Sequence, residues 1–220
     1  MAFSMYVLGI VVALVILKLA DLIKPARSLE NTLLIELPDY KVPEVKTTWL
    51  YVWDKVVDYL TRAGTIIFLM SVVIWFLMNI GPAGYTEGDP ARSFAAVIGH
   101  GLSPVLAPLG CGDWRLGVAL LVGISAKEVV VSSISVLFGV AGSALGSASL
   151  ATSLASVGFG PANALAFMTF CLLYVPCIAA IATIASESKS WKFTLKVLGL
   201  ELIVAWCLSF VVFHVASIWV

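Results

Sequence analysis

A lysine and a glutamate, Lys127 and Glu128, are adjacent in the middle of an otherwise apolar stretch that runs from Leu116 to Gly139. The stretch is long enough to cross a bilayer, where a charged side chain at the centre costs roughly 2.5 to 3.5 kcal/mol on insertion scales. Neighbouring helical residues point about 100° apart, so the two charges cannot pair with each other on a regular helix. Each charge therefore needs its own partner, or the helix is broken at this point.

Small and hydroxyl-bearing residues surround this charged pair: Gly123, Ser125, Ser132, Ser133 and Ser135. Such residues let helices approach closely, and their hydroxyls can hold water, ions or freed backbone groups. One interpretation is a structural ion pair with another span, for which Glu201 is a candidate partner of Lys127. The other is a substrate path lined by the charged pair together with Ser125 and Ser132, because intramembrane charges usually mark such paths.

A proline followed by a cysteine, Pro176-Cys177, interrupts a second apolar stretch. Proline removes the hydrogen bond to the carbonyl four residues earlier, here Leu172, and distorts the preceding turn. Unwound backbone of this kind can coordinate a cation in transporters, and a thiol adds a soft ligand suited to Fe(II), Zn(II) or Cu(I). Ordinary proline kinks and buried cysteines are the alternative explanation.

The remaining ligand-type residues favour structural roles. Cys171 lies six positions before Cys177, so the two thiols would not chelate one ion on an unbroken helix. Cys111 and Asp113 belong to a tight turn, in which Asp113 is expected to be the N-cap of the next helix. His100 and His214 have no helical partner at i+4, and no catalytic, nucleotide-binding or zinc-protease motif is present. We therefore expect no enzymatic activity and no bound cofactor in this chain.

The composition indicates an integral membrane protein. Hydrophobic residues make up 61% of the chain and charged residues 12%, with a mean hydropathy of +1.05. Average soluble domains have roughly 25% charged residues. The 13 basic and 13 acidic residues cancel, so nucleic-acid binding is not expected.

We predict an all-α, polytopic fold with about six transmembrane passes and broken or re-entrant helices. A span needs about 20 apolar residues. Five stretches qualify, and a sixth, from Ser93 to Gly110, is interrupted by His100, Pro104 and Pro108. The five are Phe3 to Ala20, Gly64 to Ile80, Leu116 to Gly139, Pro161 to Ala185, and Val197 to Trp219.

The distribution of basic residues favours six passes over five. With six, one side of the membrane receives every basic loop residue except Arg92, in agreement with the positive-inside rule. With five, the cluster from Lys189 to Lys196 would face away from the other basic loops. Both chain ends are then expected outside the cytoplasm.

Three parts follow from this layout: a first transmembrane helix at 1–20, a cytoplasmic linker at 21–62 and a membrane region at 63–220. In the linker, residues 36–40 favour turns or extended chain, whereas apolar residues at helical spacing from Trp49 to Leu60 predict an amphipathic helix on the cytoplasmic face. The uncharged loop from Val140 to Gly160 is expected to be a flexible extracellular connection or a re-entrant segment packed against protein.

At these residues the sequence resembles the membrane part of the prokaryotic ferrous iron transporter B family. The similar blocks occur in the family's order and cover nearly the whole chain. They are Glu36-Leu37-Pro38-Asp39-Tyr40, Arg62-Ala63-Gly64-Thr65-Ile66-Ile67-Phe68, Val73-Ile74-Trp75-Phe76-Leu77, Pro108-Leu109-Gly110, Gly112-Asp113-Trp114-Arg115, Ala126-Lys127-Glu128-Val129-Val130-Val131-Ser132 and Leu173-Tyr174-Val175-Pro176-Cys177.

The resemblance implies transport of Fe(II) as substrate across the cytoplasmic (inner) membrane. Cys177 matches the cysteine of the family's second gate region and is a candidate for the iron path, as are Pro176 and Leu172. The family's GTP-binding domain and first gate region have no counterpart here, so GTP would act only through an absent domain or a partner chain. The chain is then expected to be a fragment or one subunit of a split transporter.

Further partners implied are the lipid bilayer, small ferrous iron transport accessory proteins and a second copy of the chain. Related gate-type membrane regions also occur in proteins linked to nucleoside movement. A carrier of a nucleoside-like organic solute is therefore the alternative function, and an inactive membrane scaffold is a third.

Overall fold

The computed structural model describes residues 2–23, 43–82, 84–86, 88–140 and 146–219. These residues are almost entirely helical, which confirms the predicted all-α membrane fold. The chain divides into two compact units, Met1–Thr61 and Arg62–Val220, and each is described by itself. The predicted linker residues 36–40, together with Lys24, Arg27 and Lys41, lie outside the described residues.

The first unit contains helix α1 (Ala2–Ile23) and the beginning of α2 (Val45–Asn79). The amphipathic helix predicted from Trp49 onward is confirmed as helical, and it starts at Val45. Its apolar residues are largely exposed, and the rings of Trp49 and Trp53 stack with centroids 6.5 Å apart. Exposed tryptophans of this kind are typical of helices at a membrane interface. Helix α2 continues without a break to Asn79, so the amphipathic segment and the predicted second span are one helix.

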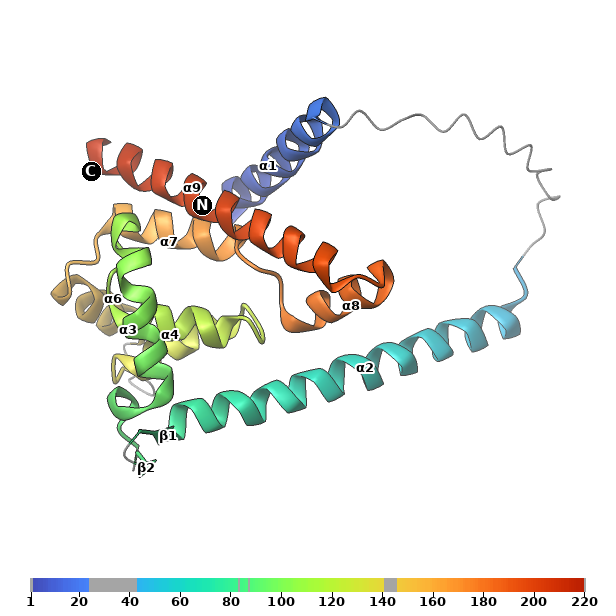
Figure 1. Ribbon diagram of the computed structural model, residues 1–220, viewed down its shortest axis with the longest axis horizontal. Helices are drawn as coiled ribbons and strands as arrows, with labels where there is room; N and C mark the ends of the chain where they lie inside the picture. Colours follow the sequence, from blue (N-terminus) through green and yellow to red (C-terminus); the bar gives the residue numbers. More distant parts are fainter. Residues whose placement is uncertain (1, 24–42, 83, 87, 141–145, 220) are drawn as a thin grey trace. The chain divides into compact units, whose positions relative to one another are not determined.

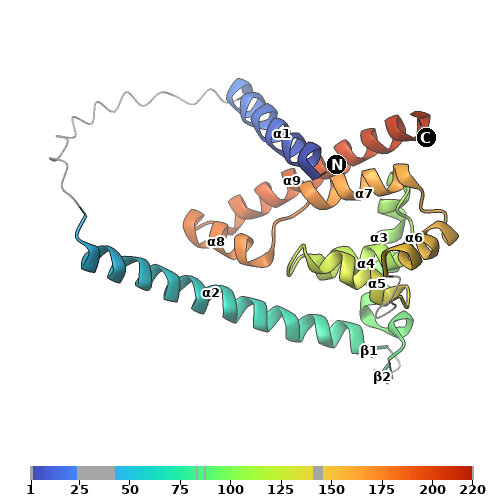
Figure 2. The same cartoon turned by 180° about the vertical axis from the view of Figure 1, so that it is seen from behind.

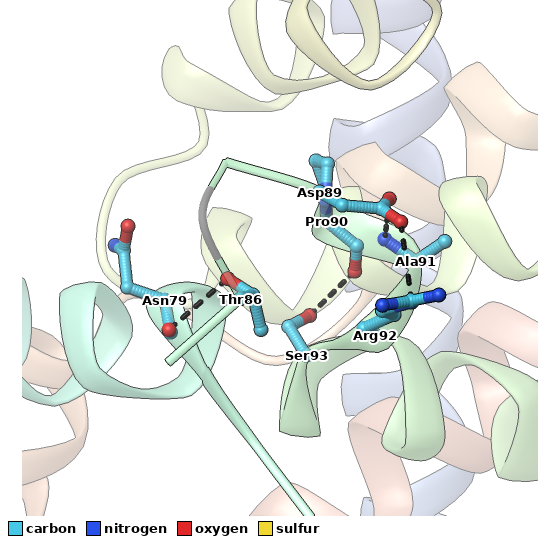
Figure 3. A network of polar contacts seen from close by, with 7 residues as sticks. All are labelled: Asn79, Thr86, Asp89, Pro90, Ala91, Arg92 and Ser93. Atoms are coloured by element: carbon cyan, nitrogen blue, oxygen red, sulfur yellow. Dashed lines mark hydrogen bonds and ion pairs between the residues drawn. The ribbon is translucent and has the colours of Figure 1, made fainter. Parts of the chain in front are cut away.

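A short polar connection joins α2 to α3 (Phe94–Leu106) in the second unit (Figure 3). It contains the two-residue strands β1 (Ile80–Gly81) and β2 (Gly84–Tyr85) and the 3-10 turn η1 (Pro90–Arg92). The Thr86 hydroxyl donates to the Asn79 carbonyl at 3.0 Å and thereby closes the end of α2. Ser93 caps α3 by accepting from the Ala96 amide at 3.2 Å.

Helix α3 meets α4 (Trp114–Gly123) at 103°, through the 3-10 turn η2 (Ala107–Leu109). Gly110 has a φ of 73°, which favours glycine, and Asp113 accepts from the Arg115 amide at 2.8 Å. The predicted N-cap at Asp113 is therefore confirmed. The guanidinium carbon of Arg115 lies 4.7 Å from the centroid of the Phe138 ring, and the Arg115 Nε is buried.

Two described helical segments are long and apolar enough to cross a membrane, Pro161–Ser188 and Trp191–Trp219, and the bent α3–α4 pair can be counted as a third. The apolar parts of α1 and α2, Phe3–Leu19 and Gly64–Asn79, are shorter. The multi-pass class follows from these helices, whereas the total of six passes and the positions of both ends stay predictions.

The core of the second unit lies between α4, α7 (Pro161–Leu173) and α9 (Trp191–Trp219). Helix α7 packs along α9, with Ala166 and Ala205 completely buried (Figure 1). Small residues allow this close approach where lipid provides no hydrophobic driving force. Helix α8 (Ile178–Ser188) turns back onto α9 (Figure 2). Part of the predicted loop at 140–160 is helix α6 (Gly146–Ser156), whose Leu150 and Leu154 pack against the core.

Candidate functional site

The predicted span from Leu116 to Gly139 is broken in its centre. Helix α4 ends at Gly123 and α5 (Val129–Leu137) begins after five residues that form turns. Because the helix is broken, the Ile124 carbonyl does not accept a hydrogen bond from an amide of its own helix. It accepts instead from the Ile178 amide at 2.9 Å. Of the two alternatives for the adjacent charges, a broken helix is therefore correct.

The second predicted break lies directly opposite, because Ile178 is the first residue of α8. Helix α7 ends at Leu173, and Tyr174 has extended backbone with a φ of −69° and a ψ of 173°. Pro176 has no amide with which to satisfy the Leu172 carbonyl, as expected from the sequence. The Leu172 and Tyr174 carbonyls accept from no backbone amide in the described part of the chain.

The ammonium of Lys127 fills this gap. Its Nζ donates to the carbonyl oxygens of Leu172 and Tyr174, each at 3.2 Å, and lies 4.9 Å from the centroid of the Tyr174 ring. Helix C-termini carry partial negative charge, and an aromatic face attracts cations. The two broken helices thus meet around one positive charge.

The described residues provide no carboxylate within 4.0 Å of Lys127, so the ion pair with Glu201, one of the two interpretations, is not formed here. The Glu201 carboxylate interacts electrostatically with the ammonium without contacting it. One oxygen of Glu201, Oε2, is buried and has no hydrogen-bond partner among the described residues. An unpartnered buried carboxylate oxygen is costly and calls for a functional explanation.

The structure brings some predicted site residues together and separates others. Ser125 and Cys177 are half-buried within the two breaks, where the Ser125 hydroxyl donates to the Val122 carbonyl at 2.6 Å. Glu128 and Ser132 are exposed, and their side chains make no hydrogen bond to the described residues. The Glu128 side chain therefore takes no part in the contacts around Lys127. Among the described residues no three His, Cys, Asp or Glu side chains form a metal-binding group, so the role of Cys177 stays a prediction.

Two site residues had no role in the sequence-based prediction. Tyr174 supplies both a carbonyl and a ring, and its hydroxyl donates to the Leu120 carbonyl at 3.3 Å. Ile124 supplies the carbonyl that joins the breaks. The role of Tyr174 could have been suggested by its place two positions before Pro176, since the backbone near a helix-ending proline leaves the regular helix.

An apolar cavity of about 390 Å³ adjoins the breaks in the second unit. Helices α3, α4, α7 and α9 line it, and its lining includes Leu106, Ile124, Tyr174 and Trp206. Of its three aromatic residues, the two with polar side-chain atoms already use them, because the Trp206 Nε1 donates to the Val105 carbonyl at 2.9 Å and the Tyr174 hydroxyl donates to the Leu120 carbonyl. The cavity therefore offers little hydrogen bonding to a solute.

Comparison with known proteins agrees with this architecture. Residues 60–191 match the family model Gate, described as "Nucleoside recognition", and residues 2–55 match "Ferrous iron transport protein B C terminus". These matches and the broken helices define a gate-type helical membrane protein. The chain belongs to the ferrous iron transporter B family, of which it corresponds to the C-terminal membrane part.

Curated relatives extend over nearly the whole chain. The Fe(2+) transporter FeoB of Staphylococcus aureus (strain COL) is 37% identical over 99% of this chain and 32% of its own length. The Methanocaldococcus jannaschii FeoB is 38% identical over 95% of this chain and 31% of its own. A Porphyromonas gingivalis "Fe(2+) transport protein A/Fe(2+) transporter FeoB fusion protein" is 31% identical over 97% and 30%. The chain thus spans about a third of these relatives, and no solved structure matches.

Proposed function

We propose that this chain is the C-terminal membrane part of a transporter that carries Fe(II) into the cell across the cytoplasmic membrane of a prokaryote. The observation that carries the proposal is the meeting of two broken helices around freed carbonyl oxygens, in a chain similar along its length to proteins named Fe(2+) transporters. Discontinuous helices with exposed carbonyls are the usual cation sites of transporters.

The rest of the machinery lies on other domains or chains. We infer that a GTPase domain and a first gate region act with this chain, either in one longer polypeptide or as a separate subunit. The fused relative supports a small accessory protein of the transport protein A type as a further partner. Cys177 would offer iron a thiolate or thiol along the path, and Glu128 a carboxylate outside the Lys127 site.

Reconstitution tests this proposal. The chain alone in liposomes is expected to take up little Fe(II) under anaerobic conditions, and addition of the partner with the GTPase domain and first gate is expected to produce uptake. Full uptake by the chain alone contradicts the need for a partner, and no iron uptake by the complete assembly contradicts the function. Pro176→Ala in the assembly should lower uptake about tenfold, which corresponds to about 1.4 kcal/mol. Pro104→Ala, a helical proline outside the breaks, is the matched control.

A nucleoside-like solute is the second candidate, favoured by the description of the family model that matches residues 60–191. The apolar cavity argues against it, since a base or sugar needs hydrogen-bonding groups. Uptake of a radiolabelled nucleoside and of Fe(II) by the same liposomes distinguishes the two, because each kind of carrier accumulates only its own substrate.

A further inference from the structure

We propose that the carbonyl oxygens of Leu172 and Tyr174 form a cation site that the Lys127 ammonium occupies at rest and from which the transported divalent cation displaces it toward Glu201. This inference rests on the proposed function, because the incoming cation is the substrate of that function. To that function the inference adds the oxygen atoms that bind the cation, the ammonium that holds their place at rest and the carboxylate toward which this ammonium moves.

The carbonyl oxygens are held ready for a cation. Leu172 cannot bond to residue 176, which is proline, and Tyr174 has left the helix, so both oxygens point to a common donor 3.2 Å away. Backbone carbonyls replace the hydration shell of ions in membrane proteins. The hydrogen bond from Ile178 to Ile124 and the Tyr174 hydroxyl bond to Leu120 anchor this segment to α4.

The electrostatics permit one cation at a time. Lys127 is stabilised by dipoles and an aromatic face, with no carboxylate within 4.0 Å in the described part of the second unit. A divalent ion placed beside the ammonium would be strongly repelled, because charges a few ångströms apart in a low-dielectric interior interact by several kcal/mol. Entry of the ion therefore requires Lys127 to leave.

Glu201 provides the destination. Within the described part of the chain its Oε2 is buried without a hydrogen-bond partner, and the carboxylate and the Lys127 ammonium interact electrostatically. A displaced ammonium that pairs with Glu201 satisfies this oxygen and removes its own repulsion from the ion. Two carbonyls do not complete the coordination of a metal. Cys177, which lies in the same break, and water would supply the remaining ligands, and sulfur favours Fe(II) over Mg(II).

Binding of Mn(II), measured by electron paramagnetic resonance on the chain in lipid nanodiscs, tests the competition. Lys127→Met vacates the carbonyls and should tighten Mn(II) binding about tenfold or more. Lys127→Arg, which keeps a cation, should not. Pro176→Ala in the Lys127→Met background restores an amide for Leu172 and should abolish the gain. Lys192→Met, at an exposed position of α9, is the matched control. Unchanged Mn(II) affinity in a folded Lys127→Met variant overturns the proposal.

A second measurement on the unmodified chain does not depend on the folding of a variant. A lipid-soluble carbodiimide joins lysine and glutamate side chains that lie in contact, and mass spectrometry detects the linked peptides. Mn(II) should increase the Lys127–Glu201 cross-link several-fold, and Glu201→Gln should abolish it. A cross-link that does not respond to Mn(II) overturns the displacement. If instead the complete assembly fails to transport Fe(II) while both measurements succeed, the transport function is wrong and the cation site stands.

Discussion

Lys127 contacts Tyr174 in two ways. The Lys127 Nζ lies 3.2 Å from the Tyr174 carbonyl oxygen and 4.9 Å from the centroid of the Tyr174 ring. One residue thus supplies both a dipole and a π face to the same charge. The tyrosine hydroxyl is engaged separately, with the Leu120 carbonyl at 3.3 Å, so the ring cannot rotate away without loss of that bond. The two helix breaks are therefore held together by a single aromatic residue as well as by backbone.

Tyr174→Phe separates the anchoring bond from the cation contact. It should lower the free energy of unfolding by about 1 kcal/mol, the usual contribution of one hydrogen bond, and leave iron uptake largely intact. Thermal unfolding in detergent measures the change, with Tyr85→Phe at an exposed tyrosine as control. An uptake loss as large as that of Tyr174→Ala would show that the hydroxyl itself takes part in transport.

Gly123→Ala introduces a methyl group where α4, α5 and Tyr174 meet. The new Cβ would overlap a Val130 methyl carbon and would lie 2.5 Å from the Tyr174 hydroxyl oxygen. Overpacking of this kind costs about 1 to 3 kcal/mol. The unfolding temperature should therefore fall, whereas Gly101→Ala, a helical glycine with open space around its Cβ position, should leave it unchanged. Equal unfolding temperatures for both variants would contradict the close packing at the break.

Cys177→Ser should lower Fe(II) uptake by the complete assembly more than Cys171→Ser or Cys207→Ser. The reason is that Cys177 lies in the break, whereas Cys171 belongs to α7 and Cys207 to α9. Of the three substitutions, only Cys177→Ser removes a soft sulfur ligand from the predicted iron path. If all three variants lose the same uptake, Cys177 has a packing role.

Glu128→Gln should impair uptake while the amount of folded protein stays the same. The carboxylate is exposed in the second unit and makes no hydrogen bond among the described residues, so its removal breaks no internal contact. Glu187→Gln, at an exposed glutamate of α8, is the control, and size-exclusion chromatography measures folded protein. Full activity of Glu128→Gln would assign that glutamate to neither path nor gate.

The sequence indicated both sites at which a helix could break, as one of two alternatives in each case, but not that the breaks meet. An isolated intramembrane charge pair and a proline each disturb a helix locally, and that disturbance can be derived from neighbouring residues alone. The partner of Lys127 could not be derived from neighbouring residues, because Leu172 lies 45 positions away along the chain. Charge complementarity favoured Glu201, whereas the folded chain uses carbonyls, since a freed helix end is also an acceptor.

Other elements show the same division between local and distant information. The Asp113 cap and the helix after Trp49 depend on near neighbours and were predicted correctly. The helix at Gly146–Ser156 was missed as such, because glycine and serine lower its helical preference despite its alanines. Its Leu150 and Leu154 pack against distant helices.

The acceptors around Lys127 are main-chain atoms, and so are both partners in the bond between Ile178 and Ile124. Replacement of the Leu172 side chain leaves its carbonyl oxygen in place. An alanine substitution at this position would therefore not reveal the role of that oxygen. The side chain at position 172 can therefore change without a change in this chemistry. A change of the backbone itself, such as an ester in place of an amide, would test these oxygen atoms directly.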